Sequence, residues 1–301
     1  MVTGSKPLKT YNEVYFAARK KLKAAGIEAF ALEARLIAEK AAGKTREEFL
    51  RDANLYVGTG YAETVDDMIR RRLDDEPVAY ITGEWEFYGL PINVTPDVLI
   101  PRTDTELLAE KAIALLSGRG GGSRVMDLCC GSGCVGIAVA ANVPGTRMVF
   151  IDNSPKAMAV CRSNLMRNGL TRFASYTETD ALQAPPMLIG RFDMIVCNPP
   201  YIPTADLKKL DRSVREYEPV TALDGGGDGL EFYRAVTEKW SSVLKPGGAL
   251  LYECGIGQGQ DVAEILRKNG YRAVTVYQDT QGIDRVVAGI TTGGEENGRE
   301  G

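Results

Sequence analysis

The chain has 301 residues, about a quarter of them charged, and a net charge of −4, which suits a globular protein of two domains. It contains no histidine, and this excludes Ser-His-Asp triads and zinc sites that depend on histidine. No apolar run approaches the roughly twenty residues of a membrane-spanning helix, and no secretory signal opens the chain. We therefore expect a soluble, cytoplasmic protein without a membrane partner.

The six cysteines show no CxxC spacing, so we expect reduced, buried thiols and no metal site. The slightly acidic balance also disfavours direct binding to nucleic acid, because such binding draws on lysine and arginine contacts to phosphates. Any acid–base step must use residues other than histidine, the backbone or water.

Residues 1–75 show the periodicity of helices. Apolar residues recur at helical spacing over 14–25, 31–42 and 62–73, and Gly26 and Gly43 are placed to end the first two helices. Alternation typical of strands is absent from this region. The pattern predicts a small helical bundle domain over residues 1–75.

A change of pattern begins at Pro77. Aromatic and β-branched residues alternate over 79–94, with a turn predicted at 89–91, and this pattern is typical of a β-hairpin. We predict a hairpin linker over residues 76–100. A helix should begin near Asp104 or Thr105, because an acidic residue in a first turn favours the helix dipole.

From Arg124 onward, strands alternate with helices. Strands separated by helices of ten to fifteen residues predict a parallel, doubly wound sheet of the α/β class over residues 101–290. The last two strands should form an antiparallel pair, and the Gly-rich tail, 291–301, is predicted to be disordered. The predicted strands are 124–129, 148–153, 175–180, 192–198, 248–255, 271–279 and 284–290.

A glycine-rich turn directly follows the first of these strands. Its glycines allow a tight turn and a close approach of a ligand to the backbone, and the next helix offers free N–H groups at its N-terminus. Similar turns also occur where nothing binds. The candidate ligand-binding residues of this turn are Asp127, Cys129, Cys130, Gly131, Ser132 and Gly133.

Acidic residues end the second and third strands. Asp152 follows Gly131 by about twenty residues, the spacing at which a carboxylate accepts ribose hydroxyls in nucleotide-binding folds. It could equally be a turn acid ahead of the next helix. Asp180 could accept a hydrogen bond from an adenine amino group, or could be an ordinary loop acid.

The sequence Asn198-Pro199-Pro200-Tyr201 ends the fourth strand and is the most specific signal in the chain. Successive prolines fix the backbone and remove two donors, so nearby carbonyl oxygens are left to accept hydrogen bonds. Asn198 adds an amide and Tyr201 a flat wall with a hydroxyl. This set suits a planar NH₂ group, and it lies at the sheet edge where open α/β folds bind ligands.

The glycine turn, the two acids and NPPY, in this order, resemble class I S-adenosylmethionine-dependent methyltransferases that act on planar nitrogen. Residues 98–106, VLIPRTDTE, resemble the signature VLIPRPDTE of the PrmC/HemK family of release factor glutamine methyltransferases. The segments 214–223, 246–259 and 284–289 also correspond to that family, as do the hairpin and the helical N-terminal domain. The resemblance extends over roughly residues 10 to 290.

The resemblance implies transfer of a methyl group from S-adenosylmethionine, leaving S-adenosylhomocysteine, to the glutamine side-chain nitrogen of the Gly-Gly-Gln motif in bacterial release factors. Asn198 and the Pro199 carbonyl would hold the glutamine NH₂ beside Pro200 and Tyr201. Arg102 would close the rim of the site. The glycine turn and Asn198 would lie beside the cofactor, Asp152 would bind its ribose and Asp180 its adenine. The N-terminal helices would recognise the release factor, and we expect a monomer.

Four positions depart from the family pattern. Cys129 and Cys130 replace a Gly-Thr pair, Thr103 replaces a proline, and Ala181 stands where the family often has an aromatic residue that could stack on adenine. We expect these changes to alter cofactor affinity without abolishing activity.

Three other functions remain open. NPPY also suits the amino group of adenine in DNA, although a basic recognition region is lacking. A glutamine methyltransferase that acts on a ribosomal protein would use the same chemistry. A non-catalytic binding module could keep the same fold, although an intact NPPY argues against it.

Overall fold

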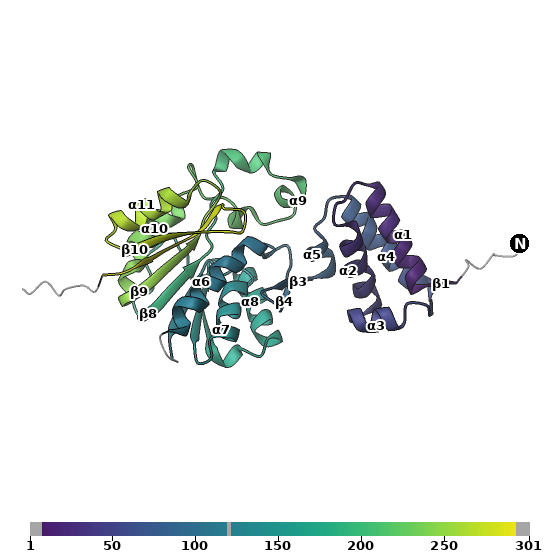
Figure 1. Cartoon of the computed structure of the whole chain (residues 1–301), viewed down its shortest axis with the longest axis horizontal. Coiled ribbons are helices and arrows are strands. Elements are labelled where there is room, and N and C mark those ends of the chain that lie inside the picture. The colour runs from purple at the N-terminus through teal and green to yellow at the C-terminus, as the bar shows by residue number, and fades with distance from the viewer. Residues whose placement is uncertain (1–7, 119–121, 293–301) are drawn as a thin grey trace, which may run out of the picture. The chain divides into compact units, whose positions relative to one another are not determined.

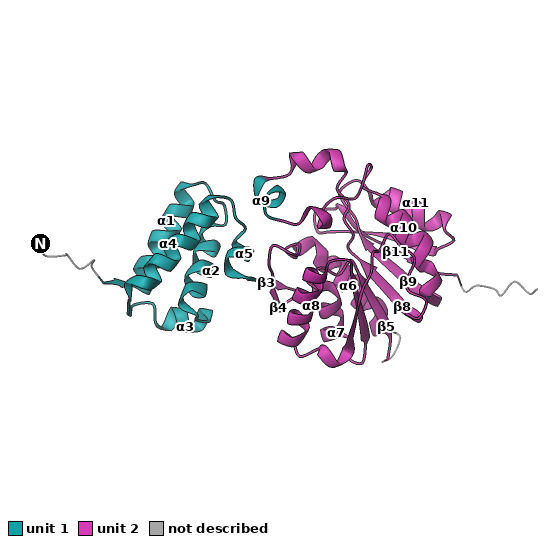
Figure 2. Cartoon of the chain, turned by 180° about the vertical axis from the view of Figure 1, so that it is seen from behind, with its two compact units in different colours: residues 1–84, 212–217 teal, residues 85–211, 218–301 magenta. Residues whose placement is uncertain are grey.

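The computed structural model describes residues 8–118 and 122–292. The chain divides into two compact units, one of residues 1–84 with 212–217 and the other of residues 85–211 with 218–301 (Figure 2). Within the described residues, no helix is long and apolar enough to cross a membrane. The predicted disordered tail, 291–301, lies outside the described residues from position 293 onward.

The first unit is a helical bundle (Figure 1). The predicted helices at 14–25, 31–42 and 62–73 are confirmed, and they pack against one another. Leu22, Ile37 and Ile69, one from each helix, are buried. The structure adds a short third helix and a pair of two-residue strands, which are too short to produce a detectable alternation. The elements are β1 (Lys9–Thr10), α1 (Tyr11–Ala24), α2 (Phe30–Ala42), α3 (Arg46–Arg51), β2 (Tyr56–Val57) and α4 (Thr59–Leu73).

The segment predicted as the first strand of the hairpin is instead helix α5 (Val78–Thr82). All five of its residues are buried, and Gly83 ends it in a left-handed conformation. The hairpin is shorter and pairs β3 (Glu84–Phe87) with β4 (Leu90–Asn93). Its turn is at Tyr88 and Gly89, both with positive φ, which is the geometry that matches strand twist and that Pro91 could not adopt.

The second unit contains a seven-stranded sheet, in the order β10-β11-β9-β8-β5-β6-β7. The first five strands along the chain run parallel, and β11 is antiparallel to both of its neighbours. The sequence-based prediction of a doubly wound α/β sheet with an antiparallel end is therefore confirmed. The strands are β5 (Arg124–Leu128), β6 (Arg147–Asp152), β7 (Ala174–Glu178), β8 (Phe192–Cys197), β9 (Leu244–Glu253), β10 (Arg272–Gln278) and β11 (Asp284–Ile290).

Helices cover both faces of this sheet (Figure 1). One group is α6 (Glu106–Ser117), α7 (Cys134–Asn142) and α8 (Pro155–Arg167), and the other is α10 (Glu231–Trp240) and α11 (Gly259–Lys268). Ser154 accepts a hydrogen bond from the N–H of Ala157 and so caps α8. Between β8 and α10 the chain forms short helices, of which α9 (Arg212–Arg215) is grouped with the helical unit (Figure 2).

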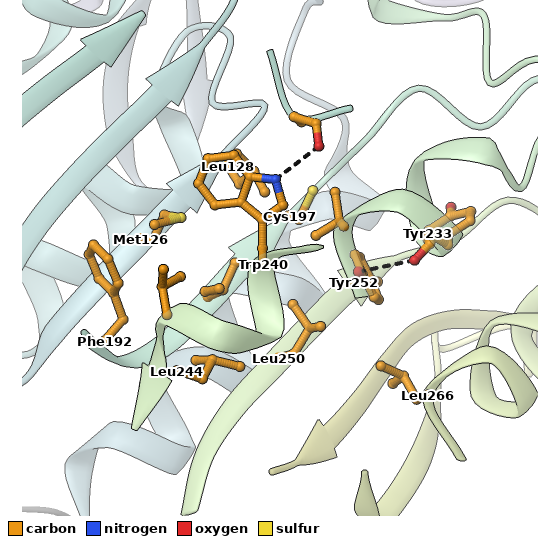
Figure 3. Packing of buried hydrophobic residues seen from close by; sticks show 14 of the residues in the cluster. Met126, Leu128, Phe192, Cys197, Tyr233, Trp240, Leu244, Leu250, Tyr252 and Leu266 are labelled. Atoms are coloured by element: carbon orange, nitrogen blue, oxygen red, sulfur yellow. Dashed lines mark hydrogen bonds between the residues drawn. The ribbon is translucent and has the colours of Figure 1, made fainter. Parts of the chain in front are cut away.

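The core between the sheet and α10 is built around Trp240 (Figure 3). Its ring is fully buried with Met126, Phe192 and Leu250, among others. Its indole N–H donates a 2.9 Å hydrogen bond to the carbonyl oxygen of Ala181, in the loop after β7. One side chain of α10 therefore fixes both the core and the loop that carries Asp180.

Replacing Trp240 with phenylalanine should destabilise the protein. The carbonyl of Ala181 would lose its donor in a buried environment, so we expect the free energy of unfolding to fall by about 1–3 kcal/mol. The matched control is Trp85→Phe, because that ring is only half-buried. Urea unfolding of both variants gives the comparison, and equal stability of the two variants would contradict this role.

Candidate active site

The four sequence-predicted groups meet at one edge of the sheet, where β5, β6, β7 and β8 end. A pocket of about 930 Å³, open solvent at its mouth included, lies at this edge. Gly133, Pro199 and Tyr201 do not line it. The predicted residues that do line it are Arg102, Asp127, Cys129, Cys130, Gly131, Ser132, Asp152, Asp180, Asn198 and Pro200.

The glycine-rich turn is held in left-handed backbone conformations. Gly131 and Gly133 have φ of +53° and +78°, and Cys129 has φ of +60°. This conformation costs a residue with a Cβ roughly 1–2 kcal/mol, so Cys129 introduces backbone strain into the turn. Gly133 caps α7, and a Cβ on it would lie 2.6 Å from the sulfur of Cys161.

Asp152 links the end of β6 to this turn. One carboxylate oxygen accepts from the N–H of Gly131 at 2.9 Å, and the other accepts from the N–H of Ser154 at 3.0 Å. Burial raises the pKa of this carboxyl. Each oxygen keeps a lone pair, so Asp152 can still accept from ligand hydroxyls in the pocket.

Asp127, in β5, stabilises the first turn of α7. It is 2% exposed, and its Oδ2 accepts from the N–H of Gly136 at 2.8 Å. Only glycine fits at position 136, because a Cβ there would lie 2.8 Å from that same oxygen. Burial raises the pKa of Asp127 to about 7, and the charge of Asp152 contributes to the rise.

The loop after β7 carries Asp180 and Ala181, and it supplies no aromatic ring to the pocket. The carboxylate of Asp180 accepts from the N–H of Leu182 at 2.9 Å, and Ala181 is buried in the core. An aromatic ring does line the same pocket, but it comes from Phe232 on α10. Its position depends on how α10 packs, and the sequence analysis missed it.

The NPPY residues separate into two groups. Asn198 and Pro200 line the pocket, and the side-chain NH₂ of Asn198 donates to the hydroxyl oxygen of Thr105 at 3.4 Å. Tyr201 packs against the core, and its hydroxyl donates to Glu253 at 3.4 Å. Burial is the main cause that raises the pKa of Tyr201. Thr105 and Glu253 were not among the predicted site residues.

Arg102 is held at the pocket by a buried acid. Its guanidinium pairs with one oxygen of Glu218, which is 5% exposed, and the other oxygen accepts from the N–H of Ile100 at 3.2 Å. Glu218 therefore joins the segment 98–106 to the segment 214–223. Both segments resemble the family in sequence, but neither segment by itself predicts that the two are in contact.

Comparison with known proteins identifies the family. Residues 13–83 match the family model of the PrmC N-terminal domain, and residues 104–214 match that of the Methyltransferase small domain. A release factor glutamine methyltransferase of Geobacter sulfurreducens is 44% identical over 74% of this chain and 76% of its own length. The chain belongs to the release factor glutamine methyltransferase family.

A second relative covers nearly the whole chain. A relative from Caulobacter vibrioides is 36% identical over 93% of this chain and 96% of its own length. A solved methyltransferase of Pyrococcus furiosus, 18% identical, shares the fold with a TM-score of 0.50 over 75% of this chain and 99% of its own. The predicted family membership is therefore confirmed, and the chain is a methyltransferase.

The stability of this methyltransferase should depend on the titration of Asp127. Its pKa in the folded protein, about 7, lies above the ordinary value of 3.8, so folded protein retains a proton that unfolded protein releases. The resulting stabilisation is complete below about pH 4 and is lost as pH rises to about 7. Asp127→Asn removes this titration and keeps an acceptor for Gly136.

From pH 5 to pH 8, Asp127→Asn should gain stability relative to wild type, on the order of 2 kcal/mol. Urea unfolding of both proteins at each pH measures this difference, and the other titrating groups cancel because both proteins share them. A difference that does not change with pH would contradict the assigned role of Asp127.

Proposed function

We propose that this protein transfers a methyl group from S-adenosylmethionine to the side-chain amide nitrogen of the glutamine in the Gly-Gly-Gln motif of bacterial release factors. One observation carries the proposal: Asn198 of NPPY lines the same pocket as Asp152 and the glycine turn. A group that can hold a planar NH₂ is thereby placed beside groups that suit a nucleoside. The family membership agrees with this arrangement.

The residues of the pocket fit S-adenosylmethionine. Asp152 has spare acceptor capacity for ribose hydroxyls, and Asp180 lies in the neighbouring loop for the adenine amino group. Phe232 offers a flat face, and the turn 129–133 brings backbone and the start of α7 to the pocket. When bound, this cofactor supplies an electrophilic methyl group.

The protein's own contribution is to orient the glutamine nitrogen. An amide nitrogen is a poor nucleophile because its lone pair is delocalised into the carbonyl. Within residues 8–118 and 122–292, neither Asn198 Oδ1 nor the Pro199 carbonyl oxygen accepts a hydrogen bond. Asn198 Oδ1 can therefore accept from one N–H group of the glutamine in the pocket. The proposal assigns the other N–H group to the Pro199 carbonyl oxygen, next to the pocket-lining Pro200, and holding both N–H groups would direct the nitrogen lone pair.

These same oxygens stabilise positive charge as it develops on the nitrogen. The methylated nitrogen is strongly acidic, so its proton can leave to water after transfer. No histidine is needed as a base, in agreement with the composition. Arg102, fixed by Glu218, stands at the pocket where it can close over a bound chain.

The helical unit has a separate role in the proposal. We assign the binding of the release factor to the helical domain predicted over residues 1–75, with 76–100 as the linker and 101–290 as the methyltransferase domain. Exposed apolar side chains support a docking role, among them Phe16, Leu50 and Tyr56. Release factors act on ribosomes, so the proposal places the reaction in the cytoplasm, with the enzyme acting as a monomer.

Two variants should separate catalysis from cofactor binding. Asn198→Ala removes an acceptor for the substrate, so kcat should fall by at least about a hundredfold while S-adenosylmethionine still binds. Asp152→Ala removes the ribose acceptor and should weaken cofactor binding by about ten- to a hundredfold. Calorimetric titration and methyl transfer to release factor give both quantities.

The assignment fails if Asn198→Ala methylates release factor at the wild-type rate. It is also contradicted if Asp152→Ala binds the cofactor as tightly as wild type does. Circular dichroism of each variant controls for folding.

A further inference from the structure

Glu253 is a buried acid directly behind the NPPY loop, and the mechanism above does not use it. It is the last residue of β9, and the register that pairs Cys197 with Tyr252 places it level with Asn198 on the neighbouring strand. It is 2% exposed. Its Oε1 accepts from Tyr201, but its Oε2 has no hydrogen-bond partner among the described residues. A buried carboxyl oxygen without a donor is costly and requires an explanation.

The donor best placed for Glu253 is the hydroxyl of Thr105. Thr105 is 2% exposed, lines the pocket and directly precedes α6. Thr105 lowers the pKa of Glu253, against the rise that burial causes, so a hydroxyl at this position favours the carboxylate form. The oxygen of the same hydroxyl receives the NH₂ of Asn198 at 3.4 Å. Thr105 therefore stands between the buried acid and the pocket asparagine.

A hydroxyl has a single proton, so Thr105 can donate a hydrogen bond to Glu253 or to Asn198, but not to both. If Thr105 donates its proton to the carboxylate of Glu253, its oxygen can only accept, and it accepts from the NH₂ of Asn198. The NH₂ end of the Asn198 side-chain amide is then bonded to Thr105, and the carbonyl oxygen at its other end can accept from a ligand. If Glu253 is protonated, it can donate to Thr105, and the Thr105 proton can turn toward Asn198. The asparagine amide is then free to reverse and to present its own NH₂ to the substrate NH₂.

We propose that Glu253 is a positioning residue whose carboxylate, acting through Thr105, turns the carbonyl oxygen of Asn198 toward the substrate amide. This inference rests on the proposed function for the identity of that substrate. The NPPY motif alone does not determine which end of the Asn198 side-chain amide faces the substrate. In this proposal, an acid more than fifty residues away in the sequence determines it.

The proposal makes catalysis depend on pH. Burial raises the pKa of Glu253 to about 7, against the lowering effects of Thr105, Arg285 and Tyr201. The pKa values of the neighbouring thiols and phenols are all raised, so these groups stay neutral near pH 7. Arg285 is also paired with Asp104, at 2.8 Å. The titratable and charged groups that face Glu253 are Asp104, Cys134, Tyr201, Tyr233, Cys254 and Arg285.

The first test does not require substrate. We would follow the side-chain NH₂ signals of Asn198 by NMR from pH 6 to pH 8, with an Asn198→Ala sample for assignment. The signals should shift with a midpoint near pH 7 in wild type, and this shift should be absent from Glu253→Gln. Thr105→Val should abolish the shift although Glu253 is still present, whereas Thr105→Ser should retain it.

Thr146→Val is the matched control for Thr105→Val. Thr146 is also 2% exposed, and its hydroxyl oxygen has no hydrogen-bond partner among the described residues. It directly precedes β6 and does not line the pocket. This variant should keep the wild-type pH response. If the response survives in Thr105→Val, proximity to Glu253 alone causes it, and the proposed role of Thr105 is overturned.

The second test measures turnover. In wild type, kcat for release factor should rise with pH through about 7, while Glu253→Gln should show a flat profile with kcat lowered about ten- to a hundredfold. Cofactor affinity should be unchanged. Wild-type rate and pH profile in Glu253→Gln would overturn the inference. A wild-type enzyme inactive on release factor would instead overturn the proposed function, and the NMR result would still decide the role of Glu253.

Discussion

The site depends on one geometric constraint, that parallel strands direct their carboxyl ends to the same edge of a sheet. Because β6, β5 and β8 are neighbours, the turn after β5 lies between Asp152 and Asn198, residues that are far apart in the sequence. Helices that follow these strands cover opposite faces of the sheet (Figure 1). The pocket lies at the edge where the strands end. The residues that we propose bind the cofactor are thus brought together with the NPPY motif by the topology of the sheet.

Buried polar residues then fix the loops at this edge. Asp127 holds the start of α7, Glu218 joins the segment of Arg102 to the segment after NPPY, and Glu253 bonds to Tyr201. Trp240 holds the loop of Asp180 through a backbone carbonyl. Each of these groups is buried and is hydrogen-bonded to another part of the protein at this edge of the sheet. The shape of the pocket therefore depends on buried polar contacts around it.

The sequence predicted the strands well, and most of the residues that it singled out line one pocket, because hydrophobic alternation and short motifs are local signals. Whether those residues bind ligand stays a prediction. It failed at α5, where buried aromatic and branched residues resemble a strand, although Gly83 ends a helix there. It also missed Glu253 and Phe232. Glu253 lies in an apolar strand, and neither its burial nor its contact with Tyr201 is visible locally. Phe232 reaches the pocket only through the packing of α10.

The central claim is that the glutamine of the Gly-Gly-Gln motif is the methyl acceptor. The most direct measurement is transfer of label from S-adenosylmethionine to purified release factor and to its Gln→Ala variant in that motif, with a ribosomal protein mixture and duplex DNA alongside. The account predicts label on the intact factor and none on the variant. Label on both forms of the factor, or only on ribosomal protein or DNA, would contradict it.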